Sequence, residues 1–283
     1  MYEQFYGLRE KPFSLAPDPG FLYLARRHQH ALTMLEYVLG EASGFALITG
    51  EVGCGKTTVV RHVLERVEQV LNVGFVTNTH KGFGPLLPWV LEALRIGPGA
   101  GSQSEQYRRL VEHARAEYAA GRRLVLVIDE AQNLGVEGLE ELRVLSNMNE
   151  GKHTMIQTIL IGQPELRKLL RRRSLRQFAQ RIAMEYHLEA LQSEETCAYI
   201  AHRVGVAGGP SRLFSLAACE AVHICSGGVP RLINTVCDTA LVYGFADQKP
   251  VIDVEIIEQV LLDRSGVLPL QRAPDAAAPA LAG

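Results

Sequence analysis

Residues 50–58 read GEVGCGKTT, between an apolar run at 45–49 and an apolar-periodic segment that begins at Val59. The pattern GxxxxGK[ST] between a strand and a helix is typical of a phosphate-binding loop, because its glycines let backbone N–H groups turn toward phosphate oxygens. In that interpretation the Lys56 ammonium reaches the β- and γ-phosphates of a nucleotide, and the Thr57 hydroxyl ligates Mg²⁺. The residues expected to bind the nucleotide here are Gly50, Glu51, Val52, Gly53, Cys54, Gly55, Lys56, Thr57 and Thr58.

A second motif, LVLVIDEAQ, ends an apolar run with two adjacent acids. The Asp129 carboxylate is expected to hold the Mg²⁺ shell, and the Glu130 carboxylate to deprotonate a water that attacks the γ-phosphate. A GTPase usually carries DxxG at this strand end and an NKxD motif later, and neither pattern occurs here. The adjacent acids therefore favour ATP hydrolysis. A small-molecule kinase of the same superfamily is a weaker alternative, because it leaves Glu130 and the later GGVPR motif unexplained.

Two remote polar residues are predicted to respond to the γ-phosphate. Gln163 follows the apolar run at 155–161, and in a sheet with a central phosphate strand it falls between the phosphate loop and the Asp129 strand. Arg231 follows Pro230 in the first turn of an expected helix, where a cation opposes the helix dipole by about 0.3–1 kcal/mol. A nearby anion reverses that penalty, so we expect Arg231 to report the nucleotide state to the helical part of the chain.

The segment LRKLLRRRSLRQFAQRI is rich in arginine and has three interpretations. It is a solvated helix face, or it supplies an arginine finger to a neighbouring subunit's nucleotide, or it is a patch for DNA phosphates. Arg181, directly before an apolar run, and Arg176 are the finger candidates. Arg171, Arg172 and Arg173 are expected to be surface charge.

Apolar runs alternate with amphipathic stretches, which predicts buried parallel strands separated by helices. The expected strands are 45–49, 73–77, 124–128, 155–161 and 182–186, with a helix at 28–39 before the first. Residues 1–27 hold three prolines and are expected to be irregular. Four helices follow residue 191: one capped by Ser193, one after Ser215 that ends near Gly227, one from Pro230 to Tyr243, and one that opens at Asp253. The expected domains are an extension at 1–40, a core at 41–190, a helical lid at 191–264 and a disordered tail at 265–283.

Bulk properties limit the classes of partner. The 283 residues carry a net charge of −2 and a pI near 6.5, so no global field draws the chain to nucleic acid or anionic lipid. Five cysteines without a CxxC pair fit reduced thiols. No apolar run is long enough to cross a membrane, so we expect a cytoplasmic protein, or one peripheral at the inner membrane through a partner.

Together these motifs resemble those of the AAA+ ATPases. More narrowly, the chain resembles the ExeA/GspA type of general secretion and pilus assembly, through FYGLREKPFSLAPDPGFLYLARRHQHAL, IDEAQNL, LIGQPEL and LRQFAQRIAMEYHL. The resemblance covers about residues 1–264. It implies an α/β P-loop NTPase fold with a five-stranded sheet of order 5-1-4-3-2 and a C-terminal all-helical lid. It also implies ATP and Mg²⁺ at the subunit interfaces of a homo-oligomer, ring or filament, and an adenine pocket to which Phe21 to Tyr23 contribute.

Two uses of the ATPase cycle compete. The preferred one is assembly or remodelling of a secretion, pilus or polysaccharide-export complex, with protein components of that machine as partners. The alternative is a DNA-binding regulator of transposition. It is favoured by the shortness of the chain, the lack of the membrane helix that full-length ExeA/GspA proteins carry, and the Arg171–Arg173 cluster.

Overall fold

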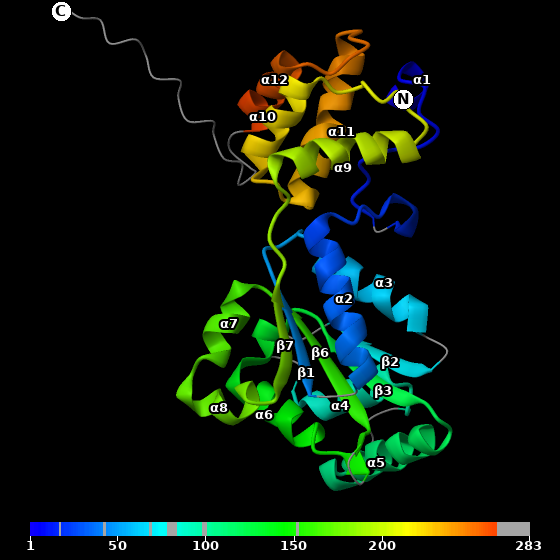
Figure 1. The fold of residues 1–283 in the computed structure, drawn as a ribbon, viewed down its shortest axis with the longest axis vertical. Helices are drawn as coiled ribbons and strands as arrows, with labels where there is room; N and C mark the ends of the chain where they lie inside the picture. Colours follow the sequence, from blue (N-terminus) through cyan, green and yellow to red (C-terminus); the bar gives the residue numbers. More distant parts are fainter. Residues whose placement is uncertain are drawn as a thin grey trace, which may run out of the picture. The chain divides into compact units, whose positions relative to one another are not determined.

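Five parallel strands form the sheet that the alternating apolar runs predicted (Figure 1). They are β1 (Phe45–Thr49), β2 (Leu71–Val76), β3 (Arg123–Ile128), β6 (Ile156–Gly162) and β7 (Ile182–His187). Their spatial order is β2-β3-β6-β1-β7, which in chain order is 2-3-4-1-5. The predicted order 5-1-4-3-2 is the same arrangement read from the other edge, and it is confirmed.

The computed structural model describes residues 1–16, 18–41, 44–67, 70–77, 84–97, 101–150 and 153–264. The tail expected at 265–283 lies outside the described residues. Residue contacts divide the chain into two units. The sheet unit consists of Arg26–Glu51 and Gly55–Leu188, and the helical unit of Met1–Ala25, Val52–Cys54 and the described part of Glu189–Gly283. None of the described helices has the length and apolarity needed to cross a membrane.

In the sheet unit, helices cover both faces, which explains why the central strands are buried throughout and mostly apolar. β1 and β6 are buried at every position. Alternate residues of β1 and β3, such as Phe45 and Leu126, pack with one set of helices, while α2 and α3 pack together and α2 contacts the edge strand β7 (Figure 1). The helices of this unit are α2 (Arg26–Glu41), α3 (Lys56–Val67), α4 (Leu86–Ala93), α5 (Gln103–Ala119), α6 (Gly135–Leu145), α7 (Pro164–Leu170) and α8 (Arg176–Ala179).

Three short elements complete the sheet unit. The 3₁₀ turn η3 (Ala131–Leu134) follows the acidic end of β3, and η4 (Arg173–Leu175) precedes α8. A two-stranded hairpin joins β4 (Asn149–Glu150) to β5 (His153–Thr154). The η3 turn matters most for the site, because it carries the chain from Glu130 directly into α6.

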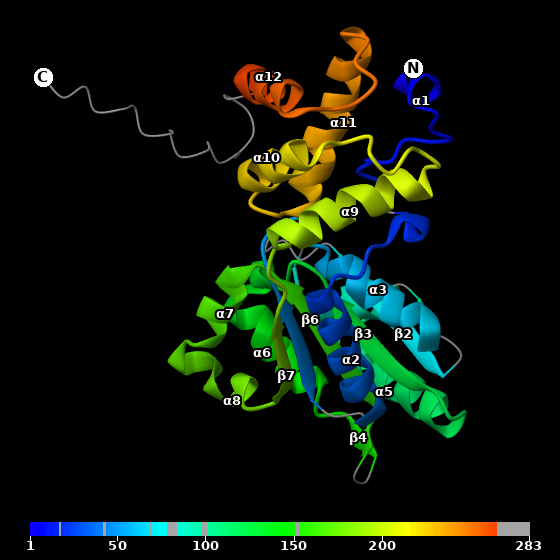
Figure 2. The same cartoon turned by 45° about the horizontal axis from the view of Figure 1, so that its top comes forward.

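The helical unit contains α9 (Ser193–Val206), α10 (Leu216–Ser226), α11 (Pro230–Ala246) and α12 (Val254–Arg264) (Figure 2). Ser215 caps α10 through its hydroxyl, and Pro230 occupies the first turn of α11, as predicted. The prediction that Ser193 caps α9 is wrong. Gln192 is the N-cap and forms a capping box with Glu195, because its amide side chain also accepts from the third backbone N–H of the helix.

The segment expected as one N-terminal extension at 1–40 is divided between the units. Residues 1–25 pack with the lid helices, and the rest forms α2 of the sheet unit. The first 27 residues are also less irregular than expected, because they contain α1 (Tyr2–Phe5) and η1 (Pro19–Phe21). Both elements contact helices of the helical unit, α1 with α11 and η1 with α9.

Arg203 of α9 anchors this N-terminal segment. Its guanidinium is 7% exposed, donates to the Pro12 carbonyl and the Tyr199 hydroxyl, and lies 4.8 Å over the Phe21 ring. A buried cation satisfied by carbonyl oxygens and a ring face cannot leave without stranding those partners.

Replacing Arg203 with Met should therefore lower the free energy of unfolding of the helical unit by about 3 kcal/mol, because buried acceptors lose a charged donor. Arg212→Met, at an exposed position of the same unit, should change it by less than about 0.5 kcal/mol. Hydrogen exchange measures both effects: residues 1–16 and α9 should lose protection in Arg203→Met, and the five strands should keep it. Unchanged protection of residues 1–16 would contradict the anchoring role.

Candidate functional site

The carboxyl ends of three neighbouring strands meet at one edge of the sheet. Thr49, the last residue of β1, is in register with Gly162, the last residue of β6, and Ile128 of β3 is in register with Leu160. The Gly50 N–H donates to the Gly162 carbonyl at 3.2 Å, so the phosphate loop begins directly beside the end of β6. Ligand sites of parallel α/β sheets lie at this edge.

The phosphate loop encloses its lysine. Lys56 is 6% exposed, and its Nζ donates to the carbonyls of Gly50 at 2.9 Å and Glu51 at 2.8 Å. Lys56 is also the first residue of α3, so the free backbone N–H groups of that helix end belong to the same loop. The loop thus gathers an ammonium and a helix N-terminus, which together favour a bound polyphosphate.

A hydrogen bond connects the phosphate loop to β3. The Thr57 hydroxyl donates to Asp129 Oδ2 at 2.8 Å, as expected for two groups that share one metal ion. A hydroxyl and a carboxylate are hard oxygen donors of the kind that Mg²⁺ prefers, and the ion takes its remaining ligands from water and substrate phosphates. The donor set therefore fits Mg²⁺.

Glu130 occupies a left-handed backbone position, φ 50°, between β3 and η3. Its carboxylate oxygen Oε2 accepts from the side-chain amides of Gln132 and Gln163, the second at 2.9 Å. The structure therefore brings Glu130 and Gln163 together, although they are 33 residues apart in the chain.

The tip of the phosphate loop packs with the helical unit. Gly53 has φ +85°, and its carbonyl accepts from the Arg231 backbone N–H at 3.3 Å. A Cβ added at Gly53 would lie 2.6 Å from Arg231 Cβ, so both the backbone angle and the close approach require glycine. The Arg231 side chain is exposed, so it is accessible to an anion.

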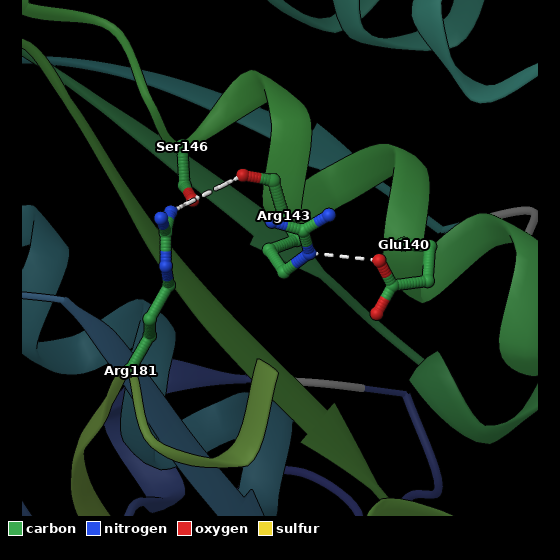
Figure 3. Close-up of polar contacts among 4 residues, drawn as sticks. All are labelled: Glu140, Arg143, Ser146 and Arg181. Atoms are coloured by element: carbon green, nitrogen blue, oxygen red, sulfur yellow. Dashed lines mark hydrogen bonds and ion pairs between the residues drawn. The ribbon is translucent and has the colours of Figure 1, made fainter. Parts of the chain in front are cut away.

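The two finger candidates differ in their surroundings. Arg181 donates to the Arg143 carbonyl at 3.3 Å and the Ser146 hydroxyl at 3.0 Å, and so caps the C-terminal end of α6 (Figure 3). A cation at this end of a helix is stabilising. Arg176 is exposed, and no carboxylate among the described residues contacts it. The same is true of Arg171, Arg172 and Arg173.

Comparison with known proteins gives the domain type and the fold. Residues 40–170 match the family model of an AAA domain. Over 247 residues the chain is 41% identical to General secretion pathway protein A of Aeromonas hydrophila, which covers 87% of this chain. The chain therefore contains an AAA domain. It spans 45% of the length of that relative.

Solved structures show the same fold at low identity. The ORC2 protein of Aeropyrum pernix has a TM-score of 0.67 at 17% identity, over 92% of this chain and 72% of that one. The RuvB Holliday junction branch migration motor of Thermotoga maritima has a TM-score of 0.54 at 15% identity, over 85% and 70%. An AAA+ fold is thus established independently of the sequence relative.

Sequence analysis of this AAA+ chain did not single out Gln132 or His187. Gln132 was visible as the polar residue two positions after Glu130, and a turn there brings i and i+2 together. His187 ends β7, and its Nδ1 lies 3.0 Å from the Thr49 hydroxyl. Burial first, and then the charge of Arg167, lower the pKa of His187. An isolated histidine at a strand end gave no signal.

The aromatic residues expected at the adenine pocket have partners within the helical unit. Phe21 is 5% exposed beneath Arg203, and Tyr23 packs edge-on against Tyr199 with ring centroids 5.8 Å apart. Their contribution to a base pocket therefore stays a prediction.

Gly53→Ala and Gly121→Ala form a matched pair, because φ is +85° at one and +77° at the other. A Cβ at Gly121 meets nothing within 4 Å, so that variant should lose only about 1 kcal/mol of unfolding free energy from the left-handed backbone. Gly53→Ala should lose more, and its affinity for an ATP analogue should fall at least about tenfold, which is roughly 1.4 kcal/mol. Denaturant unfolding and calorimetric titration measure the two effects. Equal behaviour of the two variants would contradict the close approach.

Proposed function

We propose that this chain is a Mg²⁺-dependent enzyme that hydrolyses ATP to ADP and phosphate within a homo-oligomer, and that the cycle assembles or remodels a partner complex. The observation that carries the proposal is the hydrogen bond from the Thr57 hydroxyl to Asp129, with Glu130 next in the chain. It combines a phosphate loop after β1, a general base after β3 and a metal-binding pair shared between them, with β6 between the two strands.

Each residue has a defined part in hydrolysis. In the structure Lys56 Nζ donates to a carbonyl of the loop. With a nucleotide bound, Lys56 donates to phosphate oxygens. It stabilises the charge that develops on the β–γ bridging oxygen as the bond between this oxygen and the γ-phosphorus breaks. Thr57 and Asp129 would hold Mg²⁺, which would supply positive charge to the bound phosphates. Glu130 accepts a proton from the water whose oxygen forms the new bond to phosphorus. Gln163 and Arg231 contact the terminal phosphate and respond to its loss.

Of the two finger candidates, Arg176 fits the trans-acting role better. Arg181 is engaged by two groups of α6 in its own chain, whereas Arg176 is exposed in α8. The side chain of an arginine finger must be exposed in the single subunit, because it contacts the nucleotide of a neighbouring subunit only when the two subunits meet.

The sequence relative suggests the process that uses ATP. That relative is named a general secretion pathway protein, and it aligns with 87% of this chain. We therefore propose that protein components of a secretion, pilus or polysaccharide-export machine are the partners, with the enzyme cytoplasmic or peripheral at the inner membrane.

The variant Glu130→Gln removes the base while retaining the shape of the side chain. It should bind ATP with near-normal affinity, lose turnover by at least about 100-fold, and persist as an assembled oligomer in ATP. Phosphate release and light scattering measure these properties. Glu137→Gln, an exposed glutamate in the first turn of α6, should behave as wild type. Wild-type turnover in Glu130→Gln would remove Glu130 from the catalytic role.

A mixing experiment tests the finger and the oligomer together. Arg176→Ala and Lys56→Ala should each be inactive alone, because one lacks the finger and the other the phosphate contact. A mixture should regain about a quarter of wild-type turnover, since mixed interfaces can pair an intact loop with an intact finger. Arg172→Ala serves as control and should remain active without mixing. Failure of the mixture to regain turnover, with both variants folded, would contradict Arg176 as a trans-acting finger.

A second candidate function is DNA-dependent regulation of transposition. It is favoured by the exposed arginines 171, 172 and 173, which no carboxylate of the described chain contacts. DNA affinity that requires ATP and falls steeply with salt in a gel-shift series would replace the secretion role with this one.

A further inference from the structure

Gln132 connects two parts of the site that the ATPase chemistry requires in fixed positions. Its side-chain Nε2 donates to Glu130 Oε2, and its Oε1 accepts from the Gln163 backbone N–H at 3.1 Å. One planar amide therefore joins the base at the end of β3 to the residue that follows β6. A planar amide fixes both the distance and the direction between its donor and its acceptor.

The end of β6 is shaped to admit this side chain. Gly162 precedes Gln163, and a Cβ added there would lie 2.9 Å from Gln132 Oε1 and 2.6 Å from the Leu166 side chain. The turn η3 gives Gln132 its direction, because Glu130 adopts a left-handed backbone angle and its carbonyl accepts from the Asn133 N–H at 2.9 Å. The local backbone turn thus brings the Gln132 side chain next to the Glu130 carboxylate.

Two amide donors share one oxygen of Glu130. Gln163 Nε2 donates to Oε2 at 2.9 Å, yet in the proposed mechanism the same side chain must contact the terminal phosphate. When Gln163 turns to that phosphate, Gln132 still donates to the Glu130 carboxylate. Gln132 holds Gln163 by its backbone, so the turn of the Gln163 side chain leaves this contact intact.

We propose that Gln132 is a positioning residue that keeps Glu130 oriented for water activation while Gln163 contacts the terminal phosphate. The proposal rests on the proposed ATP hydrolysis by this site. It predicts that Gln132 affects turnover without affecting nucleotide affinity, because its side-chain hydrogen bonds go to Glu130 and to the Gln163 backbone.

Gln132→Met has nearly the same length and cannot form either hydrogen bond. Turnover at saturating ATP should fall at least about tenfold, and the dissociation constant for a non-hydrolysable ATP analogue should stay within about twofold of wild type. Gln103→Met makes the same chemical change at the exposed start of α5 and should leave both quantities unchanged. Gln132→Glu provides a second, isosteric variant that lacks the amide donor, and it decides the outcome if Gln132→Met does not fold.

A readout without nucleotide separates positioning from a general loss of structure. Glutamine side-chain amide resonances of the nucleotide-free protein report the hydrogen bonds directly, with Gln163 assigned by its loss in Gln163→Ala. The Gln163 amide signal should shift in Gln132→Met and stay in place in Gln103→Met. In a Glu130→Gln background, adding Gln132→Met should lower the residual turnover by less than about twofold, because the base it positions is already absent.

Three results would overturn the inference. They are unchanged turnover in folded Gln132→Met, a loss of affinity as large as the loss of turnover, and a Gln163 amide signal that does not move. Absence of ATP hydrolysis by the wild-type chain, by contrast, would contradict the proposed function itself.

Discussion

The parallel register of β1, β6 and β3 is the constraint on which the site depends. These three strands end within two residues of one another in register, so the groups that directly follow them lie close together. The bond from the Gly50 N–H to the Gly162 carbonyl fixes the start of the phosphate loop against β6. The bond from Thr57 to Asp129 then connects the start of α3 to the end of β3. A change of one residue in either register would separate the phosphate loop from its metal-binding acid.

Hydrogen bonds from two glutamine amides to the Glu130 carboxylate connect the segments that follow β3 and β6. Glu130 follows β3 and Gln163 follows β6, and the two are connected by the bond from the Gln163 amide to the Glu130 carboxylate and by the Gln132 amide. Such a network is more restrictive than a surface ion pair, because amides have fixed donor and acceptor directions. The two candidate finger arginines differ in how far their side chains are held in place. Arg181 is confined by the end of α6, whereas Arg176 is exposed.

Much of this arrangement is readable from the sequence, for a physical reason. Strands buried on both faces produce continuous apolar runs, and a phosphate loop requires glycines at fixed spacing, so the strands and the places of Lys56, Thr57 and Asp129 at their ends were readable from the residues. The sheet order came from the resemblance to the AAA+ ATPases. The division of residues 1–25 from α2 was not readable, because contacts of this segment such as those with Arg203, a buried cation bonded to a backbone carbonyl and lying over a ring, leave no pattern in the sequence. Gln132 was missed for a similar reason. Its role comes from the left-handed angle of Glu130 and from the space that Gly162 leaves, and neither appears as a pattern of residue types.

The central claim is that the ends of β1 and β3 hold one ATP together with Mg²⁺. Calorimetric titration of a non-hydrolysable ATP analogue tests it most directly, with and without Mg²⁺, in wild type and in Thr57→Ala. We predict one nucleotide per chain in wild type, bound more tightly in Mg²⁺, and we predict that Thr57→Ala loses most of the gain from Mg²⁺ while retaining the Mg²⁺-independent binding. Folded wild-type protein that binds no adenine nucleotide, or binds it equally well without Mg²⁺, would contradict the account.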